Sequence, residues 1–327
     1  METDALVYWV ALRSVQGVGD KIFNKIYQTN RRYHLSMKEF FDLSLNDKQK
    51  KYPLSRKLAQ DIDEQKNNFT KFKQIVTQLQ KRGVKILASD SPDYPKKILR
   101  TLKDEVPPLL SCWGNLNILY RVGVAVVGSR DASEAGLKIS RRCGEILGQQ
   151  GVNIISGYAK GVDTQAHLGS LMGHGVTTIV LSYGIKQFKA KKLLKPYLKD
   201  NNYLILSQFP PNQSWTVSGA MERNKVVSAL SEAVLVIEAQ EKSGTMNEAM
   251  IALKQEKKLF VIQLDGDEKN AVGNQILLRK GAIPIHAREK DGMYEVEIGE
   301  VLKLLKLQQD EDKTEHHRED RQLPLRL

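Results

Sequence analysis

Residues 122–185 carry the pattern that most limits the folds open to this chain. Three short apolar runs, residues 122–127, 152–155 and 176–181, alternate with two segments of helix length. Short β-branched runs separated by helical segments are typical of βαβ units, which form a parallel sheet with helices on its faces. Ligands of such sheets bind beyond the carboxyl ends of the strands, where helix N-termini offer unpaired N–H groups to anions. The pattern therefore predicts an α/β fold with an anion-binding edge.

Further apolar runs extend this sheet on both sides of the central stretch. They are expected to form strands at residues 84–87, 109–113, 203–206, 233–238 and 258–263. A loop that contains Gly273-Asn274 is expected to end the sheet. The motif Ser243-Gly244-Thr245 is expected to open a helix, because serine is a favoured N-cap.

The segments outside the sheet divide the chain into three predicted parts. Residues 1–83 are expected to be helical throughout, with one long helix over roughly 54–82 that is capped by Gly83. Residues 84–288 form the predicted sheet domain. Residues 289–327 are expected to contain a short helix around Val301 and then a charged, disordered tail.

Composition excludes several classes of protein. The chain has two cysteines without a CxxC motif, and its six histidines lack metal-ligand spacing, so no zinc site or disulfide framework is expected. No run of about 18 apolar residues predicts a membrane span, and the N-terminus does not resemble a secretory signal. We therefore expect a cytoplasmic protein without a metal. A net charge of +12 favours a polyanionic partner.

Two basic segments suggest contacts with nucleic acid. Residues 14–21 read SVQGVGDK and resemble the turn of a helix-hairpin-helix, whose backbone N–H groups bind a DNA phosphate, although such turns also simply join helices. Residues 185–199 hold six lysines and no acid, with Phe188 and Tyr197 between them. A solvated helix face explains the second segment by default, and a groove for single-stranded nucleic acid is the alternative.

Four loops with phosphate-suited residues follow or precede the predicted strands. Glycine allows close backbone approach, serine caps a helix or bonds a phosphate oxygen, and arginine forks onto phosphate. The candidate binding residues are Gly128, Ser129, Arg130, Ser156, Gly157, Lys160, Asp163, Arg223, Asn224, Lys225, Ser243, Gly244 and Thr245.

The ordered motifs VVGSR, IISGYAKGVDTQAH, MERNKVVSALSEAVLVIEAQEKSGT and GN-x-x-L-x-x-x-GA resemble the DprA/Smf family of DNA-processing proteins over roughly residues 84–285. The resemblance implies an extended Rossmann-like fold after a helical domain. It also implies binding of single-stranded DNA in a pocket lined by the candidate residues, without catalysis or a cofactor. Arg130, Arg223 and Lys225 would neutralise phosphates. Members of the family form homodimers, protect the strand and help load RecA onto it.

The chain departs from the family at one motif. The family usually has Phe-Pro before x-Arg-Asn-Arg, whereas this chain has Ala220-Met221 and a lysine at position 225. The aromatic platform for a base is therefore missing there, and Trp215 or Phe209 would have to supply it.

Two alternatives remain open for the same residues. Arg223 and Glu248 resemble the pair that flanks the N-glycosidic bond in lysine decarboxylase-like LOG phosphoribohydrolases, although the full glycine-rich loop of that family is absent. Glu248 is equally explained as an acid in the first turns of a helix. The third interpretation is a domain that senses a free nucleotide.

Overall fold

The computed structural model describes residues 3–264 and 271–307. The chain divides into two compact units. The first contains Met1–Leu116, Val180–Ala190 and Leu204–Arg223, and the second contains Asn117–Ile179, Lys191–Tyr203 and Asn224–Leu327. The predicted tail, 308–327, lies outside the described residues, and the predicted division at residues 83 and 288 stays a prediction.

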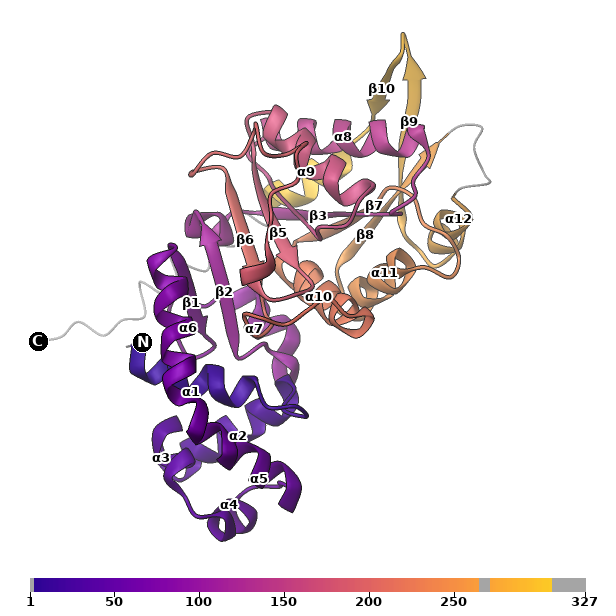
Figure 1. Cartoon of the computed structure of the whole chain (residues 1–327). Coiled ribbons are helices and arrows are strands. Elements are labelled where there is room, and N and C mark those ends of the chain that lie inside the picture. Colours follow the sequence, from indigo (N-terminus) through magenta and orange to yellow (C-terminus); the bar gives the residue numbers. More distant parts are fainter. Residues whose placement is uncertain (1–2, 265–270, 308–327) are drawn as a thin grey trace, which may run out of the picture. The chain divides into compact units, whose positions relative to one another are not determined.

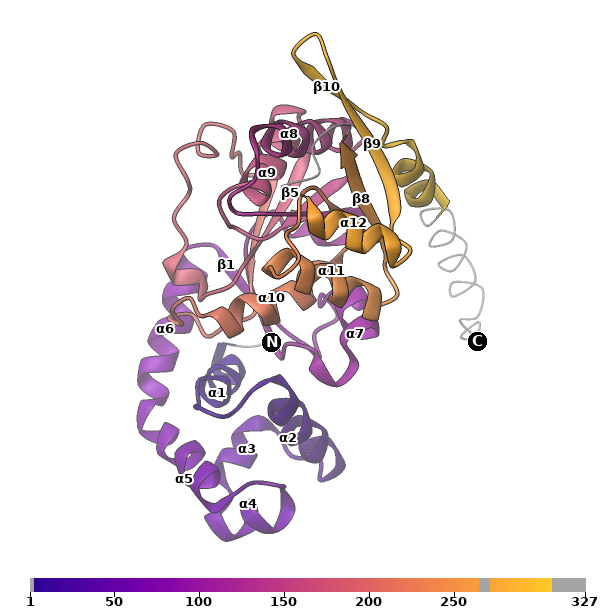
Figure 2. The same ribbon diagram turned by 90° about the vertical axis from the view of Figure 1, so that its right-hand side faces the viewer.

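The first unit begins with helices, as predicted. They are α1 (Thr3–Arg13), α2 (Asp20–Arg32), α3 (Met37–Asp42), α4 (Leu45–Lys51), α5 (Arg56–Glu64), the 3-10 helix η1 (Gln65–Asn68) and α6 (Phe69–Lys81). The single long helix expected over 54–82 is thus wrong, because one 3-10 turn interrupts it. Gly83 has a φ of +77° after α6, which confirms the predicted cap. Helix α6 packs against α1 (Figure 2).

Aromatic side chains form the core of these helices. Trp9 on α1 lies 5.1 Å from Phe23 on α2, and Phe40 on α3 lies 4.8 Å from Tyr52 after α4, measured between ring centroids. Helices α1 and α2 are joined by the turn at residues 14–19, where Arg13 forms an ion pair with Asp20 at 3.1 Å. A turn between two helices is therefore present, and the resemblance to a helix-hairpin-helix and its contact with DNA stay predictions.

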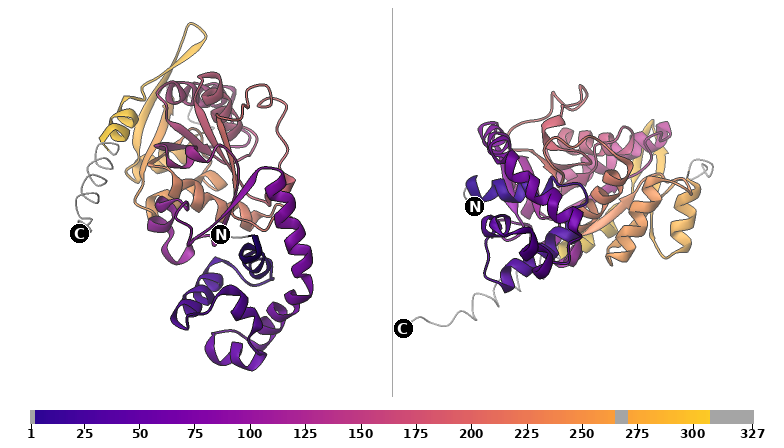
Figure 3. Two further views of the ribbon diagram at one scale, coloured as in Figure 1. Left: turned by 90° about the vertical axis from the view of Figure 1, so that its left-hand side faces the viewer. Right: turned by 60° about the horizontal axis from the view of Figure 1, so that its bottom comes forward.

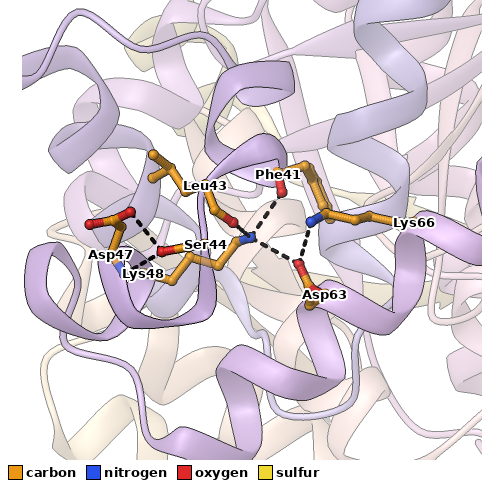
Figure 4. Close-up of polar contacts among 7 residues, drawn as sticks. All are labelled: Phe41, Leu43, Ser44, Asp47, Lys48, Asp63 and Lys66. Carbon is orange, nitrogen blue, oxygen red and sulfur yellow. Dashed lines mark hydrogen bonds and ion pairs between the residues drawn. The ribbon is translucent and has the colours of Figure 1, made fainter.

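A buried lysine joins α3, α4 and α5. The ammonium group of Lys48, which is fully buried, donates to the carbonyl oxygens of Phe41 at 2.9 Å and Leu43 at 2.6 Å (Figure 4). It also pairs with Asp63 at 3.1 Å, and Lys66 binds the same carboxylate oxygen at 2.6 Å. Burial lowers the pKa of Lys48, while its bond with Asp63 opposes that shift.

The first unit also contains three antiparallel strands of the ten-stranded sheet, in the order β1-β2-β6. Its strands are β1 (Val84–Ala88), β2 (Leu109–Gly114) and β6 (Tyr203–Ser207), and α7 (Lys96–Leu102) and the 3-10 helix η2 (Lys103–Glu105) connect the first two. The lysine-rich stretch contains only the 3-10 helix η4 (Ile185–Gln187), followed by turns. Its interpretation as a regular helix face is therefore wrong.

The second unit is the predicted α/β fold (Figure 1). After the 3-10 helix η3 (Leu116–Tyr120), its elements are β3 (Gly123–Val127), α8 (Glu134–Gln149), β4 (Asn153–Ser156), α9 (Val162–Met172), β5 (Val176–Leu181), α10 (Val217–Leu230), β7 (Ala233–Val236), α11 (Gly244–Lys254), β8 (Lys258–Leu264), α12 (Val272–Arg279), β9 (Ile283–Lys290), β10 (Met293–Val296) and a helix at 299–307. Helix α10 and strand β5 also contribute residues to the first unit.

Strands of this unit are adjacent in the order β5-β4-β3-β7-β8-β9-β10. All neighbours from β4–β5 to β8–β9 are parallel, and the β9–β10 hairpin, yellow in Figure 3, is antiparallel. Helices α8 and α9 cover one face and α11 and α12 the other (Figures 1 and 2). From β3 the chain first proceeds outward through β4 and β5, and later returns beside β3 as β7. The boundary between β3 and β7 is therefore the topological switch point, where doubly wound sheets bind ligands.

Apolar packing explains why the central strands have no polar alternation. Every residue of β3 is buried, because helices cover both faces of the strand. On the α8 face, Val124 and Val126 pack in one cluster with Cys143 of α8 and Leu305 of the last helix.

The predicted end of the sheet is wrong. Gly273 and Asn274 lie in α12 rather than in a loop, and β9 and β10 follow them. No helix among the described residues has the length and apolar character needed to cross a membrane.

Candidate nucleic-acid interface

The loops after β3, β4 and β7 meet at the carboxyl edge of the second unit. Backbone hydrogen bonds connect them: the Ser129 N–H donates to the carbonyl oxygen of Glu238 at 2.8 Å, and the Val162 N–H donates to that of Ser129 at 3.2 Å. The structure thus joins the predicted loops at residues 128–130 and 156–163 to the end of β7, and residues 243–245 follow β7 at the same edge of the sheet. Arg223 belongs to the first unit.

Two glycines allow the first two loops to approach closely. A Cβ on Gly128 would lie 2.6 Å from a methyl group of Val162. Gly161 has a φ of +80°, and a Cβ there would lie 2.4 Å from the carbonyl oxygen of Ser129. Side chains larger than hydrogen are excluded at both positions.

The first loop presents a cation to solvent. Arg130 is exposed, and the Ser129 hydroxyl accepts a hydrogen bond from the Asp131 N–H at 3.1 Å. Lys160, from the second loop, forms an ion pair with Asp131, and both side chains are exposed. An exposed pair of this kind is weak and exchanges its partner readily. Arg130 and Lys160 are therefore accessible to a phosphate.

The second loop is held by residues that face inward. The Ser156 hydroxyl is buried and donates to the Val126 carbonyl oxygen at 2.6 Å, so it serves the sheet in this structure. The Asp163 carboxylate accepts from the Ala159 N–H at 3.2 Å and closes the loop. The carbonyl oxygen of Gly157 lies 2.7 Å from Nε2 of the buried His167. These contacts give Ser156, Gly157 and Asp163 a supporting role in the loop geometry.

A lysine from the basic stretch fixes the same loop. The Lys191 ammonium group donates to the carbonyl oxygens of Tyr158 at 3.0 Å and Ala159 at 2.8 Å, and to the Thr164 hydroxyl at 2.7 Å. It also lies 4.4 Å from the centroid of the Tyr158 ring, within the range of a cation–π contact. Burial lowers the pKa of Lys191, and the charge of Asp163 opposes this shift. In the sequence Lys191 is one of six lysines in this stretch, and nothing in the pattern distinguishes it from the others.

Helix α11 begins with the predicted motif. Ser243 is its N-cap, and the serine hydroxyl accepts from the Met246 N–H at 3.1 Å, which confirms the predicted helix start. Gly244 is exposed, and no atom would lie within 4 Å of a Cβ placed on it. Thr245 is buried. The first turn of α11 is thus open to solvent at Gly244.

The predicted cationic group on α10 is mostly buried. Arg223 is 6% exposed and donates from Nη1 to the Val180 carbonyl oxygen at 3.3 Å. Asn224 is also buried, and Lys225 is half-buried, with its carbonyl oxygen bound by Gln255 at 3.2 Å. Glu248, the other residue of the hydrolase alternative, is 8% exposed on α11.

Two structural residues at this edge were missed from the sequence. The Asn274 amide donates to the carbonyl oxygens of Ile237 at 2.8 Å and Ile262 at 2.9 Å and accepts from the Ala239 N–H at 2.8 Å. It therefore ties the ends of β7 and β8 together, and its place in a family-like motif was the available clue. Glu238, at the end of β7, binds the start of α8. No group of metal-ligating side chains occurs in the part of the chain that the structure describes.

Comparison with known proteins shows which family the chain resembles. The family model for DNA recombination-mediator protein A matches residues 85–296. Protein Smf of Synechocystis is 28% identical over 315 residues, which cover 87% of this chain and 75% of that protein. Protein Smf of Escherichia coli is 32% identical over 207 residues, covering 63% of this chain and 55% of that protein.

Two solved structures have a similar fold. DNA processing protein A from Streptococcus pneumoniae matches with a TM-score of 0.71 and 25% identity, over 85% of this chain and 94% of the other. DNA processing protein A from Helicobacter pylori, studied for its mode of binding single-stranded DNA, matches with a TM-score of 0.53 and 27% identity, over 62% of this chain and 90% of the other.

Proposed function

Because this chain belongs to the DNA recombination-mediator protein A family, we propose that it binds single-stranded DNA without sequence preference. The carboxyl edge of the second unit holds the phosphates in this proposal. The relative from Helicobacter pylori binds single-stranded DNA, and the edge described above supplies suitable groups for the same ligand.

One observation carries the proposal. Exposed Arg130, exposed Lys160 and the open helix start at Gly244 come from loops that follow neighbouring parallel strands. Binding without sequence preference requires cations along the phosphate backbone, and a helix N-terminus adds N–H groups of matching polarity. Asp163, Ser156 and Gly157 keep the loops in place without contacting DNA themselves.

Binding of a single strand also requires surfaces on which bases stack. Of the two predicted substitutes for the missing family aromatic, Phe209 is buried, whereas Trp215 is 47% exposed on the loop before α10. Tyr197 is exposed in the second unit on a stretch that also exposes Lys192, Lys195 and Lys199. We assign base stacking to Tyr197, which belongs to the same unit as Arg130 and Lys160, and Trp215 of the first unit stays a separate candidate.

The wider role follows from family resemblance. In this proposal the protein is a cytoplasmic homodimer that protects single strands and passes them to a RecA-type recombinase, and it catalyses no reaction. The hydrolase alternative gains no support from Arg223 and Glu248, because both side chains are buried. A nucleotide sensor would use the same edge, and the oligonucleotide assay below distinguishes it by its lack of affinity for long strands.

The test is a salt series of fluorescence anisotropy with a labelled oligonucleotide and the full chain. We expect affinity to fall steeply between about 50 and 200 mM salt, because neutralised phosphates release counterions. Arg130→Ala should weaken binding to all sequences alike and reduce the logarithmic salt slope by about 0.7 for one phosphate contact. Arg142→Ala is the matched control, since Arg142 lies on α8 and pairs with Glu145 at 2.8 Å. Absence of binding at low salt, or affinity that ignores salt, would refute the proposal.

A further inference from the structure

The first helix of the Rossmann-like unit begins beside a carboxylate of the protein itself. In doubly wound sheets, the helix after the first strand points its N-terminus at the switch point and receives the phosphates of a nucleotide there. The corresponding strand and helix are β3 and α8, because β3 lies between β4 and β7 in the strand order. Glu238, which follows β7 across the switch point, occupies this position.

Hydrogen bonds fix the Glu238 carboxylate against the helix start. Oε1 and Oε2 accept from the Ser133 N–H at 3.2 and 3.1 Å, and Oε2 also accepts from the Ser133 hydroxyl at 2.7 Å. Ser133 is the N-cap of α8 and in turn accepts from the Gly136 N–H at 3.0 Å. The side chain of Glu238 is 95% buried, since its exposed fraction is 5%. The carboxylate thus places a negative charge at the positive end of the helix dipole.

The surrounding space is fitted to this carboxylate. A Cβ on Gly136 would lie 2.5 Å from Oε2 of Glu238, so the glycine is needed for the carboxylate to reach the first turn. The cavity that Ser133, Gly136, Glu238 and Asn274 line has a volume of about 20 Å³. That volume suits about one water molecule, and a phosphate group does not fit beside the carboxylate.

We propose that Glu238 is a built-in anion that prevents a nucleotide from binding at the switch point. It excludes phosphate from α8 in two ways, by filling the space and by repelling a second negative charge. Helix α11, which has a serine cap and an open first turn at Gly244, does not contain such a carboxylate among its described cap contacts. Glu238 is therefore a specificity-determining residue that favours the exposed edge over the nucleotide crevice.

This inference concerns the crevice and does not require that the proposed DNA binding is correct. Its test compares the full-length wild type with Glu238→Ala, in which the carboxylate is gone and space is opened. The probes are inorganic phosphate and ADP, measured by thermal shift and calorimetry at constant ionic strength, with chloride as the reference anion. Any phosphate that binds elsewhere contributes equally to both proteins and cancels in the comparison.

We expect Glu238→Ala to bind phosphate or ADP at least about tenfold more tightly than the wild type. Glu238→Gln is the matched control: it removes the charge but keeps the space filled, so it should gain much less affinity. Glu238→Ser, which retains a hydrogen-bonding partner for Ser133, replaces the alanine variant if that variant does not give a cooperative melt. Equal affinities of the wild type and a folded small-residue variant would overturn the proposal, and a gain in Glu238→Gln equal to that in Glu238→Ala would overturn its claim that the side chain excludes phosphate by filling the space.

Discussion

Gly161→Ala is expected to separate the two loops that carry the proposed phosphate contacts. Gly161 immediately precedes α9 with φ +80° and ψ −133°, a combination that residues with a Cβ rarely adopt. Its Cα also faces the preceding loop, since a Cβ would lie 2.4 Å from the Ser129 oxygen and 2.5 Å from the Arg130 oxygen. Both obstacles are backbone atoms, which cannot rotate away as a side chain does. The alanine must therefore move one loop.

The size of the effect follows from these two costs. The backbone conformation costs about 1–3 kcal/mol for a residue with a Cβ, and forcing an extra carbon into a packed site costs about 1–3 kcal/mol more. A loss of about 2–6 kcal/mol corresponds to a fall in Tm of roughly 5–20 °C for a unit of this size. DNA affinity should fall at least about tenfold as well, because displacement of Arg130 relative to Lys160 breaks the spacing of the phosphate contacts.

Gly151→Ala provides the matched control. Gly151 has a φ of +74°, but no atom would lie within 4 Å of its Cβ. It should therefore lose only the conformational cost of about 1–2 kcal/mol, and its DNA affinity should remain that of the wild type. Calorimetry and anisotropy on both variants check the prediction. If Gly161→Ala and Gly151→Ala have the same melting temperature and the same affinity for DNA, the close approach of the two loops contributes nothing to stability or binding, and the reasoning fails.

Two further substitutions test the first unit. Lys48→Met removes the buried cation of Figure 4 and leaves the carbonyl oxygens of Phe41 and Leu43 without their donor. The free energy of local unfolding of α3–α5 should therefore fall by about 2–4 kcal/mol, and amide hydrogen exchange there should become about 30- to 900-fold faster. Burial lowers the pKa of Lys48 in the folded protein, so the unfolded chain keeps this proton to higher pH. The free energy of unfolding of the wild type, relative to that of Lys48→Met, should therefore rise with pH just below 10.5, the ordinary pKa of lysine. If the difference between the two proteins does not change with pH, the assignment is contradicted. Trp215→Ala should weaken single-strand binding by about 1–3 kcal/mol with an unchanged salt slope, measured by anisotropy against Phe209→Leu, and a changed slope argues against stacking.

The sequence predicted the strands and helix starts that depend on residues close to one another in the chain. Apolar runs of β-branched residues identified β3, β4 and β5, because such runs need no knowledge of distant partners. The serine at position 243 identified the start of α11 for the same reason, since a cap acts within one turn. The meeting of loops at one edge also followed, because parallel strands place their carboxyl ends together.

What the sequence did not predict depends on contacts between distant residues. Glu238 binds Ser133 across 105 positions, and Lys191 reaches Tyr158 across 33. The spacing of residue types along the sequence does not reveal contacts between residues so far apart. Asn274 is expected in a loop but lies in α12, where its amide bonds three buried backbone groups of the strand ends at once.

Some of the predicted phosphate-binding residues are buried and others are exposed, so the salt dependence of DNA binding indicates how many cations contact the strand. Only part of the predicted phosphate set is exposed at the edge, namely Arg130 and Lys160. At about 0.7 per phosphate on a single strand, these two cations give a logarithmic slope of about −1.4. If the exposed lysines at 192, 195 and 199 also contact the strand, the slope approaches about −3.5. The measured slope therefore decides whether DNA remains at the strand ends or extends along the basic stretch beside Tyr197.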